Sequence, residues 1–230
     1  MIFEIFQESD CRYGYRKIVK QLHKNNINVN HKKIYRLMSE MNLTGLYPAK
    51  KHKYLQYKSM NQIYPYLLEN VEIISPNQVW ATDITYIKLP DRFMYFSAVI
   101  DLYSRYIISY DLSHSLKIES SLLNLNNALK INTPCIFNTD QGSQYTSNQF
   151  INILKSANIN ISMDHKGRCF DNILMERFWR TLKQECIYYY KPETISELEN
   201  ILGDFINWYN NKRLHQSLNY GIPAEIYFKN

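Results

Sequence analysis

Cysteine is scarce in this chain, and its cysteines do not form close pairs. Only four of the 230 residues are cysteine, at positions 11, 135, 169 and 186, and no Cys-x-x-Cys motif occurs. Closely paired cysteines are typical of structural zinc sites, and densely spaced cysteines are typical of disulfide-stapled folds. The sequence therefore argues against both kinds of protein and fits a reducing compartment.

Long apolar runs are also missing. No stretch approaches the roughly 18 apolar residues of a membrane-spanning helix, and no signal peptide opens the chain. There is no internal repeat and no low-complexity tract. We therefore expect a soluble, cytoplasmic protein with one good-sized core and room for a small second domain.

Acidic residues are few at the start of the chain. Residues 1–60 hold 12 Lys/Arg against 4 Asp/Glu, a net charge of +8, whereas the other 170 residues hold 15 against 17, a net charge of −2. A basic segment ahead of a near-neutral body indicates a polyanionic partner that binds this segment. The alternative is a solvated pair of charged helices.

Residues 1–46 are predicted to form a helix-turn-helix domain. A helix is expected to begin after the candidate N-cap Asn30. Its apolar residues repeat at helical spacing along one face: Ile34, Leu37, Met38 and Met41. The opposite face carries Lys32, Lys33 and Arg36, as expected of a basic recognition helix. A plain helical hairpin with a solvated face is the alternative.

Residues 47–75 are predicted to be a basic and aromatic linker. Lysines at 50, 51 and 53 are followed by tyrosines at 54, 57, 64 and 66. Such a mixture can track a nucleic-acid backbone. It fits equally well a tether that lies on the next domain.

From residue 76 the pattern indicates an α/β fold. Strands are expected at 79–88, 93–102, 106–112, 135–139 and 159–163. Helices are expected at about 117–130, 147–157, 171–186 and 196–211. Three strands in a meander, followed by alternating helix and strand, predict a mixed sheet with helices on its faces. The three tryptophans, Trp80, Trp179 and Trp208, are expected in the core.

Three acidic residues stand out by their context. Asp83 interrupts an apolar, β-branched run, where a bare carboxylate is costly unless it is paired or metal-bound. Asp140 ends a short apolar run, at the kind of strand end where sites form in α/β sheets. Glu176 lies in a helical pattern, with Asp171 and Glu185 as rivals. Carboxylates from separate elements can hold two divalent cations, which can drive phosphodiester chemistry.

Longer motifs surround these acids and resemble a known family. They are Tyr13-Gly14-Tyr15-Arg16, Trp80-Ala81-Thr82-Asp83-Ile84-Thr85-Tyr86, Asp140-Gln141-Gly142-Ser143-Gln144-Tyr145, Met175-Glu176, Leu182-Lys183, Asn207-Trp208-Tyr209-Asn210 and Pro223-Ala224-Glu225. In this order, and with 35 residues between Asp140 and Glu176, the chain resembles the second-frame catalytic subunit (OrfB) of family-three insertion-sequence transposases. That resemblance implies a ribonuclease-H-like integrase core with C-terminal helices over residues 76–230.

The resemblance implies a D,D-E polynucleotidyl transferase that cuts and joins DNA at the ends of an insertion sequence. It assigns Asp83, Asp140 and Glu176 to two Mg²⁺ ions, for which Mn²⁺ can substitute. Lys183 is expected on the same face as Glu176, because seven residues make two helical turns, and to contact a phosphate. The other expected DNA contacts are Lys32, Lys33, Arg36, Asn172, Gln144 and Lys166. Asn172 fits a helix cap equally well.

The implied partners are double-stranded DNA, at the terminal inverted repeats and the target, the first-frame product (OrfA) and further copies of the chain on DNA. The implied location is the cytoplasm, in association with the nucleoid. Members of the family usually carry some tens of residues before the Tyr-Gly-Tyr-Arg segment, and here 12 residues precede it. An incomplete unit or a truncated copy is therefore one expectation.

Three alternatives follow from the same residues. A non-catalytic DNA-binding regulator, derived from a truncated transposase, would keep the basic domain and lose turnover. A retroviral-type integrase is disfavoured because the sequence lacks the His/Cys zinc module that such proteins carry ahead of the core. A ribonuclease H is hard to reconcile with the basic first domain.

Overall fold

The computed structural model describes residues 1–46, 63–165 and 172–229. At its centre is a five-stranded mixed sheet with the strand order β3-β2-β1-β4-β5. The strands are β1 (Val79–Lys88), β2 (Phe93–Asp101), β3 (Ile107–Ser113), β4 (Ile136–Thr139) and β5 (Asn160–Met163). The first three form an antiparallel meander, and β4 and β5 run parallel to β1. The predicted mixed sheet is confirmed, with strand bounds within one residue of those expected.

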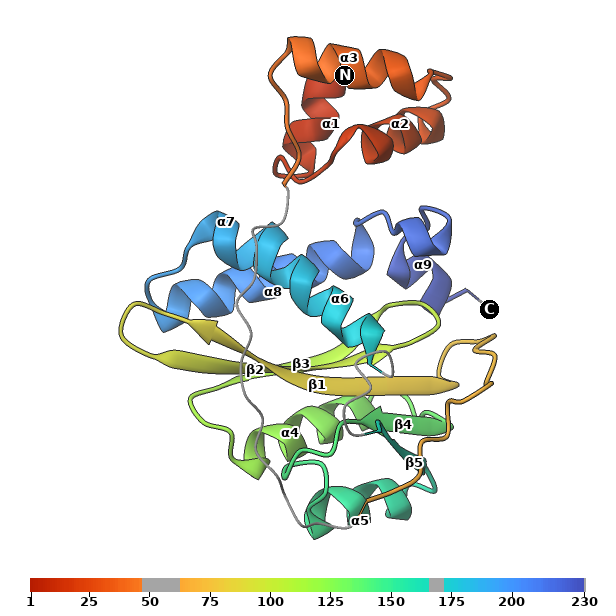
Figure 1. Ribbon diagram of the computed structural model, residues 1–230, viewed down its shortest axis with the longest axis vertical. Coiled ribbons are helices and arrows are strands. Elements are labelled where there is room, and N and C mark those ends of the chain that lie inside the picture. Colours follow the sequence, from red (N-terminus) through yellow and green to blue (C-terminus); the bar gives the residue numbers. More distant parts are fainter. Residues whose placement is uncertain (47–62, 166–171, 230) are drawn as a thin grey trace.

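Helices cover both faces of this sheet (Figure 1). On one face lie α4 (Ile118–Leu129) and α5 (Asn148–Ser156), and on the other α6 (Ile173–Leu182) and α8 (Ile195–Asn211). The short α7 (Tyr188–Tyr190), a 3₁₀ turn (Gln216–Leu218) and α9 (Pro223–Tyr227) complete this part. No helix within the described ranges combines the length and the apolar character needed to cross a membrane.

Strand β1 belongs to both apolar cores. Val79 and Ala81 pack in the core under α6 and α8, whereas Trp80 packs in the core under α4 and α5, because alternate side chains of a strand point to opposite faces. β4 pairs with β1 along residues 79–81. Beyond them, within the described part of the chain, β2 is the one strand paired with β1. Asp83 therefore lies just past the point where β4 ends.

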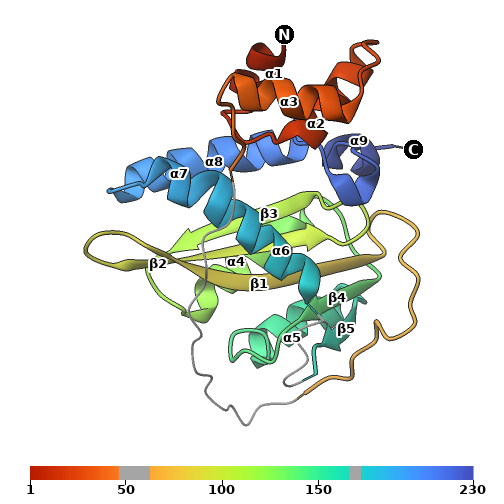
Figure 2. The same ribbon diagram turned by 45° about the horizontal axis from the view of Figure 1, so that its top comes forward.

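The N-terminal helices form a separate layer beside α7 and α8 (Figures 1 and 2). They are α1 (Ile2–Glu8), α2 (Tyr15–Lys24) and α3 (His31–Glu40). The predicted N-cap is confirmed, because Asn30 Oδ1 accepts the backbone N–H of Lys32 at 2.8 Å. Helix α1 was not predicted, since seven residues are too few to show a helical period. Met41 is exposed rather than packed, because α3 ends at Glu40.

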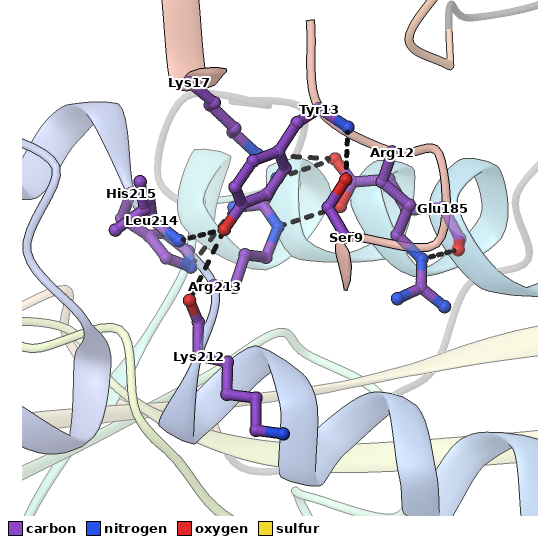
Figure 3. A network of polar contacts seen from close by, with 9 residues as sticks. All are labelled: Ser9, Arg12, Tyr13, Lys17, Glu185, Lys212, Arg213, Leu214 and His215. Carbon is purple, nitrogen blue, oxygen red and sulfur yellow. Dashed lines mark hydrogen bonds and ion pairs between the residues drawn. The ribbon is translucent and has the colours of Figure 1, made fainter. Parts of the chain in front are cut away.

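One carboxylate attaches this layer to the rest of the molecule (Figure 3). Glu185 accepts hydrogen bonds from Nε and NH2 of Arg213 at 2.8 and 2.7 Å, and its Oε1 lies 3.9 Å from Nζ of Lys17. The backbone carbonyl of Glu185 accepts a hydrogen bond from Arg12 Nε at 2.7 Å. Burial alone would raise the pKa of Glu185, but Arg213, then Lys17 and Arg12, lower it below its usual value. The three cations thus keep this acid ionised.

A tyrosine and a leucine complete the attachment. The Tyr13 hydroxyl accepts the backbone N–H of Leu214 at 3.1 Å and donates to the carbonyl of Lys212 at 3.4 Å (Figure 3). Leu214 is 1% exposed and lies in the same apolar cluster as the buried side chains of α1, α2 and α3. A residue from the C-terminal part of the chain therefore closes the core of the N-terminal layer.

The helix expected at 171–186 is not one regular helix. Helix α6 ends at Leu182 and a π-helical turn, Lys183–Ile187, follows it. The wider turn moves later side chains around the helix axis. Here Cys186 and Ile187 are buried in the core while Glu185 meets Arg213. Regular periodicity of apolar residues could not predict this change of pitch.

The described part of the predicted linker, residues 63–75, contains no helix or strand. The Pro65 carbonyl accepts the N–H of Met163 at 3.4 Å, and the Leu67 N–H donates to Ser162 Oγ at 3.0 Å. This part therefore lies along β5, as expected of a tether. The lysines at 50, 51 and 53 and the tyrosines at 54 and 57 lie outside the described residues.

Replacing Lys17 by Met should reduce the pH dependence of stability. Burial, then Arg213, lowers the pKa of Lys17 from its ordinary 10.5 to about 7, against the opposing effect of Glu185. Between these values the unfolded chain binds more protons than the folded one, so Lys17 makes stability rise with pH, by up to about 1.4 kcal/mol per pH unit. Urea unfolding at pH 7, 8 and 9 would measure the slope in both proteins.

The matched control is Lys24→Met, since Lys24 is an exposed lysine at the end of α2. This variant should keep the wild-type slope. An unchanged slope in Lys17→Met would contradict a lowered pKa of the buried Lys17 at the attachment.

Candidate active site

Three aspartates lie side by side where the parallel pairing of β1, β4 and β5 ends. The parallel pairings set one row of residues opposite one another: Ala81, Asn138 and Ser162. Asp83, Asp140 and Asp164 each follow this row by two residues. Asp140 and Asp164 come directly after the last residues of β4 and β5, at the strand ends where sites form in such sheets. The structure thus brings two of the predicted acids together and adds a third.

The Asp83 carboxylate is partly buried, and hydrogen-bond donors hold both of its oxygens. Oδ1 accepts the backbone N–H of Ile84 at 2.8 Å, and Oδ2 accepts the indole N–H of Trp179 at 2.8 Å. Burial, then the charge of Asp140, raises the pKa of Asp83 to about 7, whereas these two hydrogen bonds lower it. At neutral pH the site therefore favours binding of a proton or a cation.

Asp140 stands at the start of a tight turn. Its Oδ1 accepts the backbone N–H of Gly142 at 2.8 Å, and a Cβ added at position 142 would lie only 2.8 Å from that oxygen. Glycine is therefore required for the backbone to approach so closely. Desolvation of the carboxylate raises the pKa of Asp140 and the Gly142 hydrogen bond lowers it. The residue as a whole is exposed, so the carboxylate is reachable from solvent.

Glu176 lies on α6 and is exposed. The described residues include no group of three or more His, Cys, Asp or Glu side chains arranged to hold a metal ion, so the structure does not place Glu176 with the two aspartates in one cluster. Trp179, which contacts Asp83, is one helical turn further along α6. Residues three apart are neighbours on a helix surface, so Glu176 lies beside Trp179 on α6.

The predicted recognition-helix residues are exposed together on α3. Lys32, Lys33 and Arg36 line one open depression with Asn30. Nε of Arg36 lies 3.4 Å from Oε1 of Glu40, one turn along the same helix. An exposed pair of this kind leaves both side chains free to rearrange toward a ligand.

The other predicted DNA contacts have mixed surroundings. The Lys183 ammonium lies 5.7 Å from the centre of the Tyr86 ring, on the strand that carries Asp83. Gln144 donates to the carbonyl of Leu116 at 3.1 Å, next to the Asp140 turn. Asn172 stands at the N-cap of α6 but makes no side-chain cap hydrogen bond, so the capping alternative is not realised. Lys166 and the rival acid Asp171 lie outside the described residues.

The other rival, Glu185, is occupied by Arg213 and Lys17 at the attachment of the N-terminal layer. The expectation of core tryptophans is confirmed for Trp80 and Trp179. Trp208 is half-buried, and the guanidinium of Arg12 lies 4.4 Å from its ring centre.

Sequence reasoning missed Asp164. This residue is buried, and its Oδ1 accepts a hydrogen bond from the side-chain amide of Asn138 at 2.7 Å. Its backbone carbonyl accepts a hydrogen bond from the side-chain amide of Gln141 at 2.9 Å. Its backbone N–H donates to the carbonyl of Thr139 at 2.9 Å. These bonds brace the end of β4 that carries Asp140. The signal was available, because Asp164 ends an apolar strand as Asp140 does.

The donor set fits a hard divalent cation. Asp83 and Asp140 present carboxylate oxygens, which Mg²⁺ prefers, and the charge of Asp140 adds to the cost of ionising Asp83. Within the described residues neither carboxylate has an ion-pair partner. A bound cation would remove the repulsion between them.

Comparison with known proteins finds matching family models and similar whole proteins. Two family models described as "Integrase core domain" match residues 75–169 and 157–223, and one described as "HTH-like domain" matches residues 2–51. The InsK protein of Escherichia coli strain K12, named "Putative transposase InsK for insertion sequence element IS150", is 36% identical over 97% of this chain and 80% of its own length. The InsF transposase for insertion sequence IS3A, from the same strain, is 32% identical over 82% of this chain and 67% of its own length.

A solved structure matches the fold. The HTLV-2 integrase catalytic core domain, determined in complex with magnesium, superposes with a TM-score of 0.56 at 18% identity, over 67% of this chain and 98% of that one. This likeness confirms the expected ribonuclease-H-like integrase core.

Asp83→Asn should make the protein more stable at alkaline pH. The pKa of Asp83 is raised from 3.8 to about 7, so the cost of ionising it is absent below about pH 4 and fully present above about pH 7. The amide removes that cost, but it keeps only one of the two oxygens that accept hydrogen bonds from Ile84 and Trp179, and losing the other acceptor costs the same at every pH. Relative to the wild type, the free energy of unfolding should therefore rise by on the order of 1–3 kcal/mol between pH 5 and pH 8.

Urea unfolding in EDTA would measure the free energy of unfolding at pH 5 and at pH 8. Asp204→Asn is the matched control, because Asp204 is an exposed aspartate on α8. A gain of equal size at pH 5 and pH 8 would contradict a cost that comes from ionisation.

Proposed function

The chain belongs to the family-three insertion-sequence transposases, and we propose that it uses Asp83, Asp140 and Glu176 to cut and join DNA strands at the ends of such an element. It is a polynucleotidyl transferase with an integrase core. The observation that carries the proposed site is the pair Asp83 and Asp140, two carboxylates on adjacent strands whose burial and mutual charge raise the pKa of Asp83 to about 7. Among the described residues this pair has no cationic side chain as a partner, so a bound cation would neutralise it.

Asp83 and Asp140 would hold two Mg²⁺ ions, or Mn²⁺ in their place, and Glu176 would reach them from α6. Ions bound there supply activation of a water or a DNA 3′-hydroxyl and stabilise the leaving 3′-oxygen. The protein's own contribution is orientation. The Gly142 N–H fixes Asp140, and the Ile84 and Trp179 N–H groups fix Asp83.

No protein nucleophile is required. Tyr145 interacts with the charges of Asp83 and Asp140, but it is only 2% exposed, and burial raises the pKa of its hydroxyl well above the usual value. Its hydroxyl lies 3.5 Å from Thr82 Oγ1 inside the core. This burial supports attack by water or by a DNA 3′-hydroxyl rather than by a tyrosine.

DNA would be bound at two places. On α3, Lys32, Lys33 and Arg36 would contact the backbone and grooves of the terminal inverted repeat. Near the acids, Lys183 would contact a phosphate. The remaining candidates along this path are Asn172, Gln144 and Lys166.

Partners and location follow from the same proposal. Cutting two ends and joining them to a target calls for more than one copy of the chain on DNA, and the first-frame product (OrfA) is the expected protein partner. The enzyme would work on the DNA of the nucleoid in the cytoplasm.

Glu176→Gln should abolish strand joining while DNA binding stays within a few fold of the wild type. The amide keeps the shape of the side chain and removes the charge that would bind a cation. The assay incubates purified protein with duplex DNA that bears the flanking repeats of its own gene, with Mg²⁺, Mn²⁺ or EDTA. Joined product that requires the metal and is missing in Glu176→Gln is the expected result.

Glu199→Gln serves as the matched control, because Glu199 is an exposed glutamate on α8, and it should join like the wild type. If Glu176→Gln still joins strands, the third acid of the site is a different residue. Binding without joining in the wild type calls for a repeat with the first-frame product added. Persistent failure then would reject the catalytic proposal.

Lys32→Ala combined with Arg36→Ala should weaken DNA binding uniformly and lower its salt dependence. Each lost phosphate contact releases about one counterion fewer, so the slope should fall by about one to two. Fluorescence anisotropy from 50 to 300 mM salt would measure it. Lys130→Ala with Lys229→Ala, two exposed lysines outside the N-terminal helices, should leave the slope nearly unchanged. Equal slopes in all three proteins would remove α3 from the DNA interface.

A further inference from the structure

One buried side chain connects helix α6 to the Asp83 carboxylate. Trp179 is 7% exposed, and its Nε1–H donates to Oδ2 of Asp83 at 2.8 Å. The other oxygen, Oδ1, accepts the backbone N–H of Ile84 from the same strand. One of the two donors therefore comes from a different element, and the orientation of the carboxylate depends on where α6 lies.

The indole is itself held in place. It packs edge-on against Phe96 of β2, with ring centres 5.9 Å apart, and its ring centre lies 4.9 Å from that of Phe178. The same face of α6 buries Met175 and Leu182 in the same core. A buried indole N–H without an acceptor would be unsatisfied, so the hydrogen bond restrains both partners.

Trp179 also stands one helical turn after Glu176. The contact that fixes the Asp83 carboxylate therefore fixes the distance from the Glu176 backbone to strand β1. We propose that Trp179 is a positioning residue of the strand-cleavage site, which acts through Asp83 and sets two of the three acids relative to each other. This inference rests on the proposed role of Asp83 as a cation ligand.

Donors behind a metal-binding carboxylate orient it, and their loss typically weakens metal binding about tenfold or more. Without the indole N–H, Asp83 keeps one donor from its own strand and can rotate about its side-chain bonds. Helix α6 also loses its polar link to β1. Cation affinity should fall even in the absence of DNA.

The test compares Trp179→Phe with replacement of Trp179 by 3-benzothienylalanine, which keeps the double ring and exchanges N–H for sulfur. Mn²⁺ binding to the DNA-free, full-length protein would be measured from the paramagnetic resonance of the free ion. We expect about tenfold weaker binding in both variants. Strand joining should drop at limiting Mn²⁺ and recover in part when Mn²⁺ is raised.

Trp80→Phe is the matched control. Trp80 is fully buried in the same sheet, and its indole N–H donates to Asn77 Oδ1 at 3.1 Å, away from the acids. This variant should bind Mn²⁺ like the wild type. A loss of equal size there would attribute the effect to general loosening of the core and overturn the positioning role.

Asp83→Asn separates this inference from the proposed site. If Asp83→Asn loses Mn²⁺ binding and neither Trp179 variant does, the positioning role is wrong and the site stands. If Asp83→Asn binds Mn²⁺ like the wild type, the proposed site itself fails. If Trp179→Phe does not fold, the benzothienylalanine variant alone decides.

Discussion

Repulsion between two carboxylates is the constraint around which this fold is built. Asp83 lies in β1 and Asp140 directly follows the neighbouring parallel strand β4, so the backbone pairing that stabilises the sheet also holds their charges together. The surrounding structure offsets part of the cost with N–H donors from Ile84, Gly142 and Trp179. The part of this cost that the donors do not offset gives the site its affinity for a cation. The site therefore lowers the stability of the fold in exchange for reactivity.

The helical segment after β5 carries two acids with opposite surroundings. Glu176 is exposed on α6, whereas Glu185, nine residues later, is enclosed by Arg213, Lys17 and Arg12, which lower its pKa. Glu185 lies within the π-helical turn that follows α6, where it contacts Arg213 and Lys17. One segment therefore serves both the candidate active site and the attachment of the N-terminal layer.

Sequence patterns predicted what depends on local periodicity and missed what depends on contacts between distant segments. The strand of Asp83 was predicted with its exact bounds, because β-branched alternation and turn residues mark it. The contact of Trp179 with Asp83 was not, since a core tryptophan carries no local sign of where its N–H points. The ion pair of Glu185 could not be predicted either, because its partner Arg213 lies 28 residues further along the chain. Asp164 could have been found from its place at a strand end.

The placement of Leu214 inside the N-terminal core makes the N-terminal helices depend on a segment far along the chain. A polypeptide cut short before Arg213 would lose the side chain that closes this core and the main partner of Glu185. Truncation at that point would therefore destabilise helices that lie almost two hundred residues earlier in the sequence.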